Sequence, residues 1–230
     1  MRTVINRRSV RGGLLAAAIA GSLFLGATGC GGDEDDDGLP KDYKVVAGTQ
    51  LCGGRAMSAD ASRALKVITG SSRFEASGEQ YTVAQAASNL AMAFGDPMTY
   101  RGDACRVYTP LGTPDFELRI TWRLADSAPT DGPAAPEFTV LKMGEEALAA
   151  ADKAYVQFAC KSDKLGDSSD AAHIVIGVEH RDPFHEPEGD LKALKDAYAT
   201  VAHSVSLAMA KQLRCENDGG LPAKPVLDPA

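Results

Sequence analysis

The clearest structural signal in this chain is the alternating run Asp115-Phe116-Glu117-Leu118-Arg119-Ile120-Thr121-Trp122-Arg123-Leu124. Apolar side chains occupy every second position from Phe116 to Leu124, and polar side chains fill the positions between them. Because successive side chains of a strand point to opposite faces of its sheet, the run predicts a strand with one buried and one hydrated face. Only the apolar face of such a sheet must pack against other elements of the fold.

Helices and further strands are predicted on both sides of this run. Ser58 and Thr82 are N-cap residues ahead of apolar residues at helical spacing, which predicts helices at residues 59–69 and 83–95. Residues 144–152 contain helix formers and predict one or two helical turns. The remaining patterns predict a long amphipathic helix at about residues 189–214 and strands at residues 43–51, 73–76, 105–109, 138–141, 153–161 and 173–180.

This order of elements predicts an α+β domain, a twisted and mainly antiparallel sheet with helices on one face and a long C-terminal helix. A parallel α/β sheet is the alternative, and it is disfavoured because strands follow one another without intervening helices. We expect a single domain at residues 43–217. Residues 218–230 hold three prolines and two glycines and predict a disordered tail.

Four cysteines accompany Cys30, and an even number in an exported protein predicts two disulfides. We expect the strands at 153–161 and 173–180 to be antiparallel and the last helix to fold back along the strand at 173–180. The helix then runs in the same direction as the strand at 153–161, so their C-terminal ends lie close together. This topology predicts a Cys160–Cys215 pair and, by exclusion, a Cys52–Cys105 pair. The absence of a Cys-x-x-Cys spacing disfavours a zinc or thioredoxin-like site.

The first 29 residues have the organisation of a secretory signal peptide. Four arginines and no acidic residue lead into the small and apolar residues 14–28, a run too short for a membrane-spanning helix of roughly 20 residues. Arg7 and Arg8 resemble a twin-arginine export signal, from which Asn6 and Val10 depart. The choice between the general and the twin-arginine export routes therefore stays open.

The end of this segment, Ala27-Thr28-Gly29-Cys30, resembles the lipobox of bacterial lipoproteins, with Ala27 where leucine is more usual. The resemblance implies that Cys30 becomes the N-terminus and carries acyl chains such as palmitate, and two chains suffice for stable anchoring. A general signal-peptidase site is the alternative. Residues 30–42 include five consecutive acids, which predict a solvated linker rather than a calcium site, because adjacent carboxylates repel without converging.

The whole arrangement resembles the small two-disulfide lipoproteins of actinobacteria. The resemblance covers the lipobox, the helix that follows Cys52, the strand at Cys105, the strand at residues 155–160 and the closing helix. It implies a location on the extracytoplasmic face of the cell membrane, together with ligand or partner binding. It transfers no catalytic residue.

Charge narrows the choice of partners. The chain has 24 basic and 31 acidic residues, a formal net charge of −7. Loss of the signal peptide removes four arginines and no acid, which leaves 20 basic residues against 31 acidic ones, a net charge of −11. Nucleic acid is therefore disfavoured as a partner, because phosphate binding needs a basic face. The membrane and either an envelope protein or a small ligand are the partners expected.

The polar face of the alternating run supplies a candidate binding site. Arg119 and Arg123 project from it with Thr121 between them, and Tyr155 and Gln157 of a later strand can share that face. Two guanidinium groups can hold an anionic ligand or a partner's carboxylates. The alternative is that these are solvated strand residues.

A second cluster contains His180, Asp182 and His185, with Glu186 and Glu188 close behind. These side chains can bind a transition metal, but their spacing matches no standard zinc signature, and a polar strand-to-helix loop is the favoured interpretation.

No nucleophile elbow, Walker loop or dinucleotide fingerprint is present, so no catalytic residue and no cofactor is assigned. The expected function is a noncatalytic, membrane-tethered binding module. A cell-envelope hydrolase and a metal-binding or structural envelope protein are the alternatives.

Overall fold

The structure is a computed structural model that describes residues 43–95, 98, 100–130, 132–166, 170–182 and 186–230. The chain divides into a unit of residues 1–39 and a unit of residues 40–230, and every described residue belongs to the second. The predicted signal peptide, Cys30 and the acidic linker therefore lie outside the described residues. Among the helices that are described, none combines the length and the apolar character needed to cross a bilayer.

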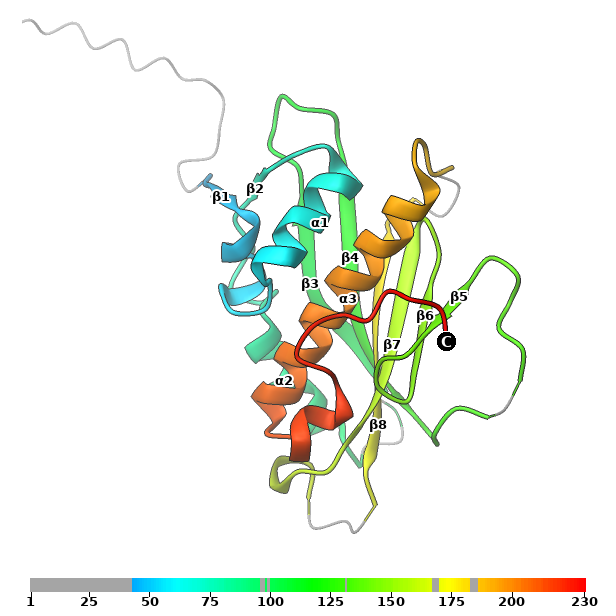
Figure 1. The fold of residues 1–230 in the computed structure, drawn as a ribbon. Coiled ribbons are helices and arrows are strands. Elements are labelled where there is room, and N and C mark those ends of the chain that lie inside the picture. Colours follow the sequence, from blue (N-terminus) through cyan, green and yellow to red (C-terminus); the bar gives the residue numbers. More distant parts are fainter. Residues whose placement is uncertain (1–42, 96–97, 99, 131, 167–169, 183–185) are drawn as a thin grey trace, which may run out of the picture. The chain divides into compact units, whose positions relative to one another are not determined.

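A twisted six-stranded sheet forms the centre of the fold (Figure 1). Its strand order is β3-β4-β8-β7-β6-β5, and each neighbouring pair is antiparallel. A separate small sheet pairs β1 with β2. The strands are β1 (Val45–Ala47), β2 (Arg73–Glu75), β3 (Arg101–Tyr108), β4 (Glu117–Ala125), β5 (Thr139–Leu141), β6 (Glu146–Ala149), β7 (Lys153–Cys160) and β8 (Ala172–His180).

The α-helices lie on one face of the large sheet (Figure 1). Each begins at a side-chain cap, because the Ser58, Thr82 and Asp190 side chains accept hydrogen bonds from backbone N–H groups of the first turn. Gly70 adopts the left-handed conformation, with φ of 73°, and ends the first helix. The helices are α1 (Ala59–Thr69), α2 (Val83–Ala93) and α3 (Leu191–Leu213), and short 3₁₀ segments are η1 (Gly48–Gly53), η2 (Asp163–Leu165) and η3 (Glu216–Gly220).

The core lies between the sheet and the helices. On β4, Leu118, Ile120 and Trp122 are at most 2% exposed, so the apolar half of the alternating run faces the helices as predicted. Helix α3 packs along the sheet with Val205 and Met209 fully buried. The predicted α+β class, with helices on one face of an antiparallel sheet and a long C-terminal helix, is confirmed.

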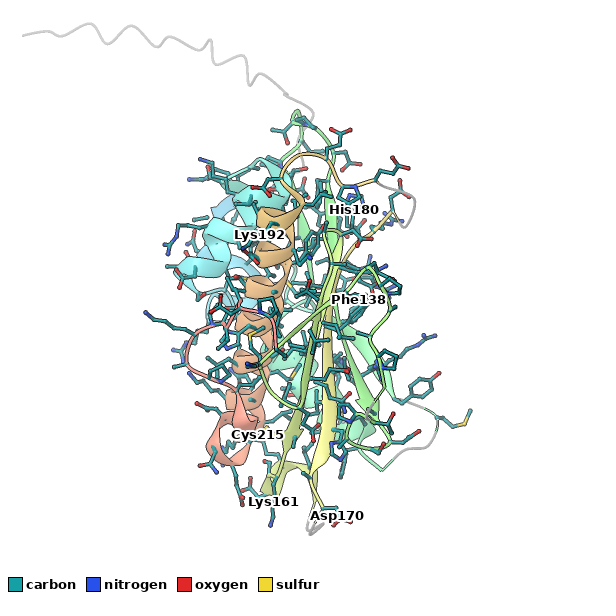
Figure 2. The ribbon with its side chains drawn as sticks, turned by 45° about the vertical axis from the view of Figure 1, so that its right-hand side comes forward. Phe138, Lys161, Asp170, His180, Lys192 and Cys215 are labelled. Atoms are coloured by element: carbon teal, nitrogen blue, oxygen red, sulfur yellow. A yellow bond between two sulfur atoms is a disulfide. The ribbon has the colours of Figure 1, made fainter. Side chains whose placement is uncertain are left out.

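Two disulfides tie the helical layer to the sheet. Cys52 of η1 bonds to Cys105 of β3, and Cys160 at the end of β7 bonds to Cys215 just after α3. These are the predicted pairs. As the prediction assumed, β7 and β8 are antiparallel, and α3 packs beside β7. Figure 2 shows Cys215 and Lys161 at the same end of the fold.

The tail beyond residue 217 differs from the prediction, because it packs on the domain. Leu221 is 7% exposed, the Pro222 carbonyl accepts a 2.8 Å hydrogen bond from His203 Nε2, and Ala230 N donates to Val140 O at 2.9 Å. We call residues 221–230 the C-terminal strap, which crosses α3 and reaches β5 (red in Figure 1). Its prolines prevent a regular helix, but Leu221, Val226 and Leu227 pack on the core.

The short helix predicted at residues 144–152 is a strand instead. Residues 146–149 form β6, which pairs with β5 on one side and β7 on the other. Ala147 and Ala149 are buried, whereas Glu146 and Leu148 are half-buried. Local helix propensity is therefore overridden by pairing with two neighbouring strands.

The face of the large sheet opposite the helices is called here the open face. It carries the polar half of β4, and the segment between β4 and β5 covers part of it. The Phe138 ring lies edge-on to the Tyr155 ring with centroids 5.8 Å apart. Figure 2 shows Phe138 on this side of the sheet, away from the helices. The candidate residues Arg119, Thr121 and Arg123 thus lie on an incompletely covered face.

Candidate functional site

Strand register brings the predicted residues of β4 and β7 onto the same part of the open face. Thr121 of β4 lies opposite Gly177 of β8, and Gly177 in turn lies opposite Tyr155 of β7. Directly opposed residues of antiparallel strands present their side chains on one face. Gly177 has no side chain, so the Thr121 side chain and the Tyr155 ring pack closely over its backbone.

Thr121, Gly177 and Tyr155 together form the floor of a hollow of about 450 Å³. A Cβ atom at Gly177 would lie 3.0 Å from Thr121 Oγ1 and 3.2 Å from Tyr155 Cδ1, so a larger residue would intrude on both neighbours. The charged and hydroxyl-bearing residues that line the hollow are Arg101, Arg119, Thr121, Arg123, Tyr155 and Glu179. Four of the five residues predicted to bind a ligand are therefore brought together.

The fifth predicted residue, Gln157, shares the open face but lies outside this hollow. Its side chain is 7% exposed, and Nε2 donates to the Ser127 carbonyl at 2.9 Å. The same nitrogen lies 3.4 Å from a carboxylate oxygen of Glu145. Gln157 therefore anchors the segment that covers one end of the open face.

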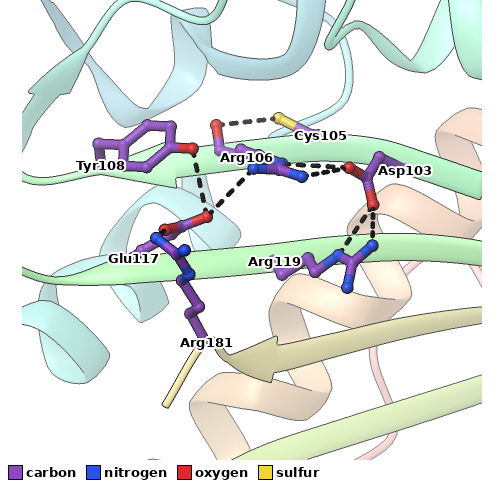
Figure 3. A network of polar contacts seen from close by, with 7 residues as sticks. All are labelled: Asp103, Cys105, Arg106, Tyr108, Glu117, Arg119 and Arg181. Atoms are coloured by element: carbon purple, nitrogen blue, oxygen red, sulfur yellow. Dashed lines mark hydrogen bonds and ion pairs between the residues drawn. The ribbon is translucent and has the colours of Figure 1, made fainter.

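Arg119 belongs to a network of ion pairs beside the hollow (Figure 3). Its Nη2 lies 2.8 Å from one carboxylate oxygen of Asp103, and Arg106 binds the other oxygen at the same distance. Glu117, which is 8% exposed, accepts from Arg181 Nη1 at 2.6 Å and lies 3.6 Å from Arg106 Nη1. Arg119 is thus ion-paired within the protein, where it shares the single negative charge of Asp103 with Arg106.

This network lowers the pKa of Asp103. Partial burial of the carboxyl raises its pKa, but the hydrogen bonds and positive charges of Arg106 and Arg119 outweigh burial. The resulting pKa lies below the ordinary value of 3.8. Asp103 therefore holds both arginines in place as a carboxylate at neutral pH.

Arg123 is in a different situation. It lies directly opposite Arg101 of β3, and both side chains are exposed. Within the part of the chain that the structure describes, neither guanidinium has a carboxylate within 4.0 Å, and Arg101 contacts the Tyr100 ring at 5.8 Å. The hollow therefore has two positive groups at one end whose charge is not neutralised locally.

Glu179 lies at the other end of the hollow, where it is the cross-strand neighbour of Arg119 and is bound by Tyr155. The Tyr155 hydroxyl donates a hydrogen bond to Glu179 Oε1. Burial, followed by the hydrogen bond and the negative charge of Glu179, raises the pKa of Tyr155 well above its usual value of 10.0. The phenol therefore stays protonated at neutral pH and fixes the Glu179 carboxylate.

A bulge in β3 explains how Arg101 reaches the hollow. Asp103 pairs with Thr121, but Cys105 pairs with Ile120, so the residue between them is extra on the β3 side. The bulge lets one strand turn Cys105 into the core for its disulfide while keeping Asp103 on the open face. Strict alternation would have placed both on one face.

Sequence reasoning missed Arg101, Gly177 and Glu179. Arg101 falls before the strand predicted at residues 105–109, since the bulge breaks the alternating pattern there. Gly177 offered a usable signal, because a glycine inside an apolar strand marks a close approach or a gap on the sheet. Glu179 follows it at strand spacing on the same face.

The metal candidates are only partly described. The backbone N–H of Asp182 donates to His180 Nδ1 at 3.1 Å, while His185 lies outside the described residues. Over the described ranges, no group of three or more His, Cys, Asp or Glu side chains is placed to hold a metal ion. The metal site therefore stays a sequence-based hypothesis.

A scan against protein-family models, a search of curated proteins and a search of solved structures each gave no match. The site is accordingly interpreted from its own chemistry. Guanidinium groups donate paired hydrogen bonds to carboxylates and phosphates. The hollow can thus bind an anion at its Arg101 and Arg123 end, and its opposite end can accept a hydrogen bond.

Proposed function

We propose that this protein is a lipid-anchored, extracytoplasmic binding module without catalytic activity, whose open face holds an anionic ligand or the carboxylates of a partner. The observation that carries the proposal is the hollow above Gly177, which gathers Arg123, Arg101 and Tyr155 from three strands. In a chain with net charge −7, this is a local excess of positive charge. An anion is the ligand that such an excess attracts.

The anchoring part of the proposal is supported by the sequence. The predicted signal peptide ends at residue 29, and the acidic residues that follow Cys30 predict a linker between that cysteine and the folded domain. The two disulfides suit an oxidising compartment outside the cytoplasm. The partners proposed are the membrane, through acyl chains, and a small ligand or an envelope protein, with no role for nucleic acid.

Fractionation and crosslinking in intact cells test both parts. Full-length protein should sediment with membranes, and Cys30→Ser should move it to the soluble fraction, because acyl chains are the proposed anchor. On the anchored protein, Arg123→Glu should abolish crosslinking to the ligand or partner. Arg63→Glu is the matched control, since Arg63 is an exposed arginine on α1, in the helical layer.

Two results would contradict the proposal separately. Membrane sedimentation of Cys30→Ser, or an N-terminal peptide without acyl groups by mass spectrometry, would reject the anchor. Equal crosslinking by Arg123→Glu and by wild type would reject the open face as the binding surface.

A further inference from the structure

Arg101 and Arg123 face each other on the open face without a neutralising acid. They are direct cross-strand partners of β3 and β4, and both line the hollow. Among the described residues neither has an ion pair, whereas Arg106, Arg119 and Arg181 each have at least one. Like charges directly opposed on antiparallel strands are unfavourable. The ligand-free protein therefore carries a repulsion that a bound anion would relieve.

The number of charges at this end points to a dianion. A carboxylate or a sulfate ester brings one negative charge and leaves one guanidinium uncompensated. A phosphate monoester carries a charge of about −1.5 to −2 at pH 7 and presents three acceptor oxygens, enough for two guanidinium groups. The phosphoryl group is thus the better complement to the pair.

The rest of the hollow restricts what the phosphoryl group can be attached to. Glu179 lies at the opposite end, with one carboxylate oxygen engaged by the Tyr155 hydroxyl. Arg119 lies directly opposite Glu179 on β4 but is already ion-paired with Asp103, and the other carboxylate oxygen of Glu179 can accept a hydrogen bond from a hydroxyl. Between the two ends, the floor at Gly177 and Thr121 is uncharged. The volume of about 450 Å³ is in the range of small-molecule sites.

We propose that the hollow binds the phosphate monoester of a small hydroxylated compound. The phosphoryl group lies on Arg101 and Arg123, and the hydroxylated body lies over Gly177 with a hydroxyl donating to Glu179. This inference rests on the proposed anion-binding function and adds the chemical class and orientation of the ligand.

Isothermal titration of the full chain, purified in detergent at fixed salt, tests the class of ligand. Glucose 6-phosphate, glucose 6-sulfate and inorganic phosphate are the probes, because the first two share one body and differ in charge. Glucose 6-phosphate should bind at least about tenfold more tightly than the sulfate. Its affinity should also fall as the pH drops below about 6, where the ester becomes a monoanion.

Variants test the orientation. Arg101→Ala and Arg123→Ala should each weaken glucose 6-phosphate by about tenfold or more, because each removes charge-assisted hydrogen bonds. Arg63→Ala, in the helical layer, should leave the affinity unchanged. Gly177→Val should reduce the affinity for glucose 6-phosphate to that for inorganic phosphate, since its side chain displaces Thr121 and Tyr155 at the floor but leaves the arginine end intact. Circular dichroism and thermal melting of each variant establish that it is folded.

Each outcome has a distinct meaning. Equal affinity for the sulfate and phosphate esters would overturn the dianion assignment while leaving anion binding intact. A Gly177→Val variant that is folded and binds glucose 6-phosphate like wild type would overturn the placement of the body. If no probe binds in an Arg123-dependent manner, the phosphate assignment fails, and Arg123-dependent crosslinking in cells then decides whether the open face binds another anion.

Discussion

The arginines of the open face fall into two groups that differ in their acidic partners. Arg106 and Arg119 share the Asp103 carboxylate, and Arg181 pairs with Glu117. In the described structure, Arg101 and Arg123 have no ion-paired carboxylate. Removal of a paired arginine should therefore affect stability in the opposite direction to removal of an unpaired one.

We predict that Arg123→Gln raises the free energy of unfolding of the ligand-free protein by about 0.2–1 kcal/mol, because it removes a like-charge contact with Arg101. Arg119→Gln should lower it, since Asp103 loses one of its two partners. Urea unfolding at pH 7 and low salt measures both. A lower free energy of unfolding for Arg123→Gln would show that repulsion between Arg101 and Arg123 does not destabilise the protein.

At the scale of single elements, the β3 bulge sets the register of β3, and the Cys160–Cys215 disulfide attaches α3 to β7. The bulge fixes which β3 side chains join the core and which join the open face. The Cys160–Cys215 bond fixes the end of α3 to the end of β7, where Glu216 N also donates to Lys161 O at 2.9 Å. The long helix is thereby held along the sheet at its C-terminal end.

Replacement of Cys160 and Cys215 by serine should lower the free energy of unfolding by roughly 4 kcal/mol, because the bond closes a loop of 55 residues. The Cys52–Cys105 bond closes a loop of similar size, with a separation of 53 residues, so its removal should cost about as much. Denaturant titration of both double variants against wild type measures the two losses. A loss below about 1 kcal/mol would show that the denatured chain is not restrained as the chain-entropy model assumes.

At the scale of the whole folded unit, the C-terminal strap covers the helical layer and joins it to the sheet edge. His203 on α3 is 2% exposed and donates from Nε2 to the Pro222 carbonyl. Burial lowers the pKa of His203 below 6.5, and the hydrogen bond to Pro222 only partly opposes this effect. The folded protein as a whole therefore favours the neutral form of the imidazole, even though the hydrogen bond to the strap opposes this effect.

This lowered pKa predicts that protonation of His203 in mild acid destabilises the folded protein. The unfolded chain takes up a proton on His203 more readily than the folded one, so the stability contribution is complete above about pH 6.5 and is lost as the pH falls through the folded pKa. Urea unfolding at pH 7.5, 6.5 and 5.5 should show a smaller decline for His203→Gln, which keeps a side-chain N–H donor but does not titrate. Parallel pH profiles for the two proteins would contradict the prediction.

The amino-acid sequence by itself determined the local features of this protein. The alternation at residues 115–124 predicts the strand and its buried face, and the caps at Ser58 and Thr82 predict where two helices begin. Such patterns depend on neighbours within a few residues, so they are readable without the fold. The disulfide pairs also followed, because they needed only the directions of two strands and one helix.

The tertiary structure alone supplied the features that depend on contacts distant in sequence. The pairing of Arg101 with Arg123 depends on the bulge between Asp103 and Cys105, which shifts the register of β3 against β4 by one residue. The hollow above Gly177 exists because three strands come into register there, and the strap is ordered because its apolar residues reach the core. Cross-strand register and docking are set by packing energies summed over the whole fold, which no local pattern of residues contains.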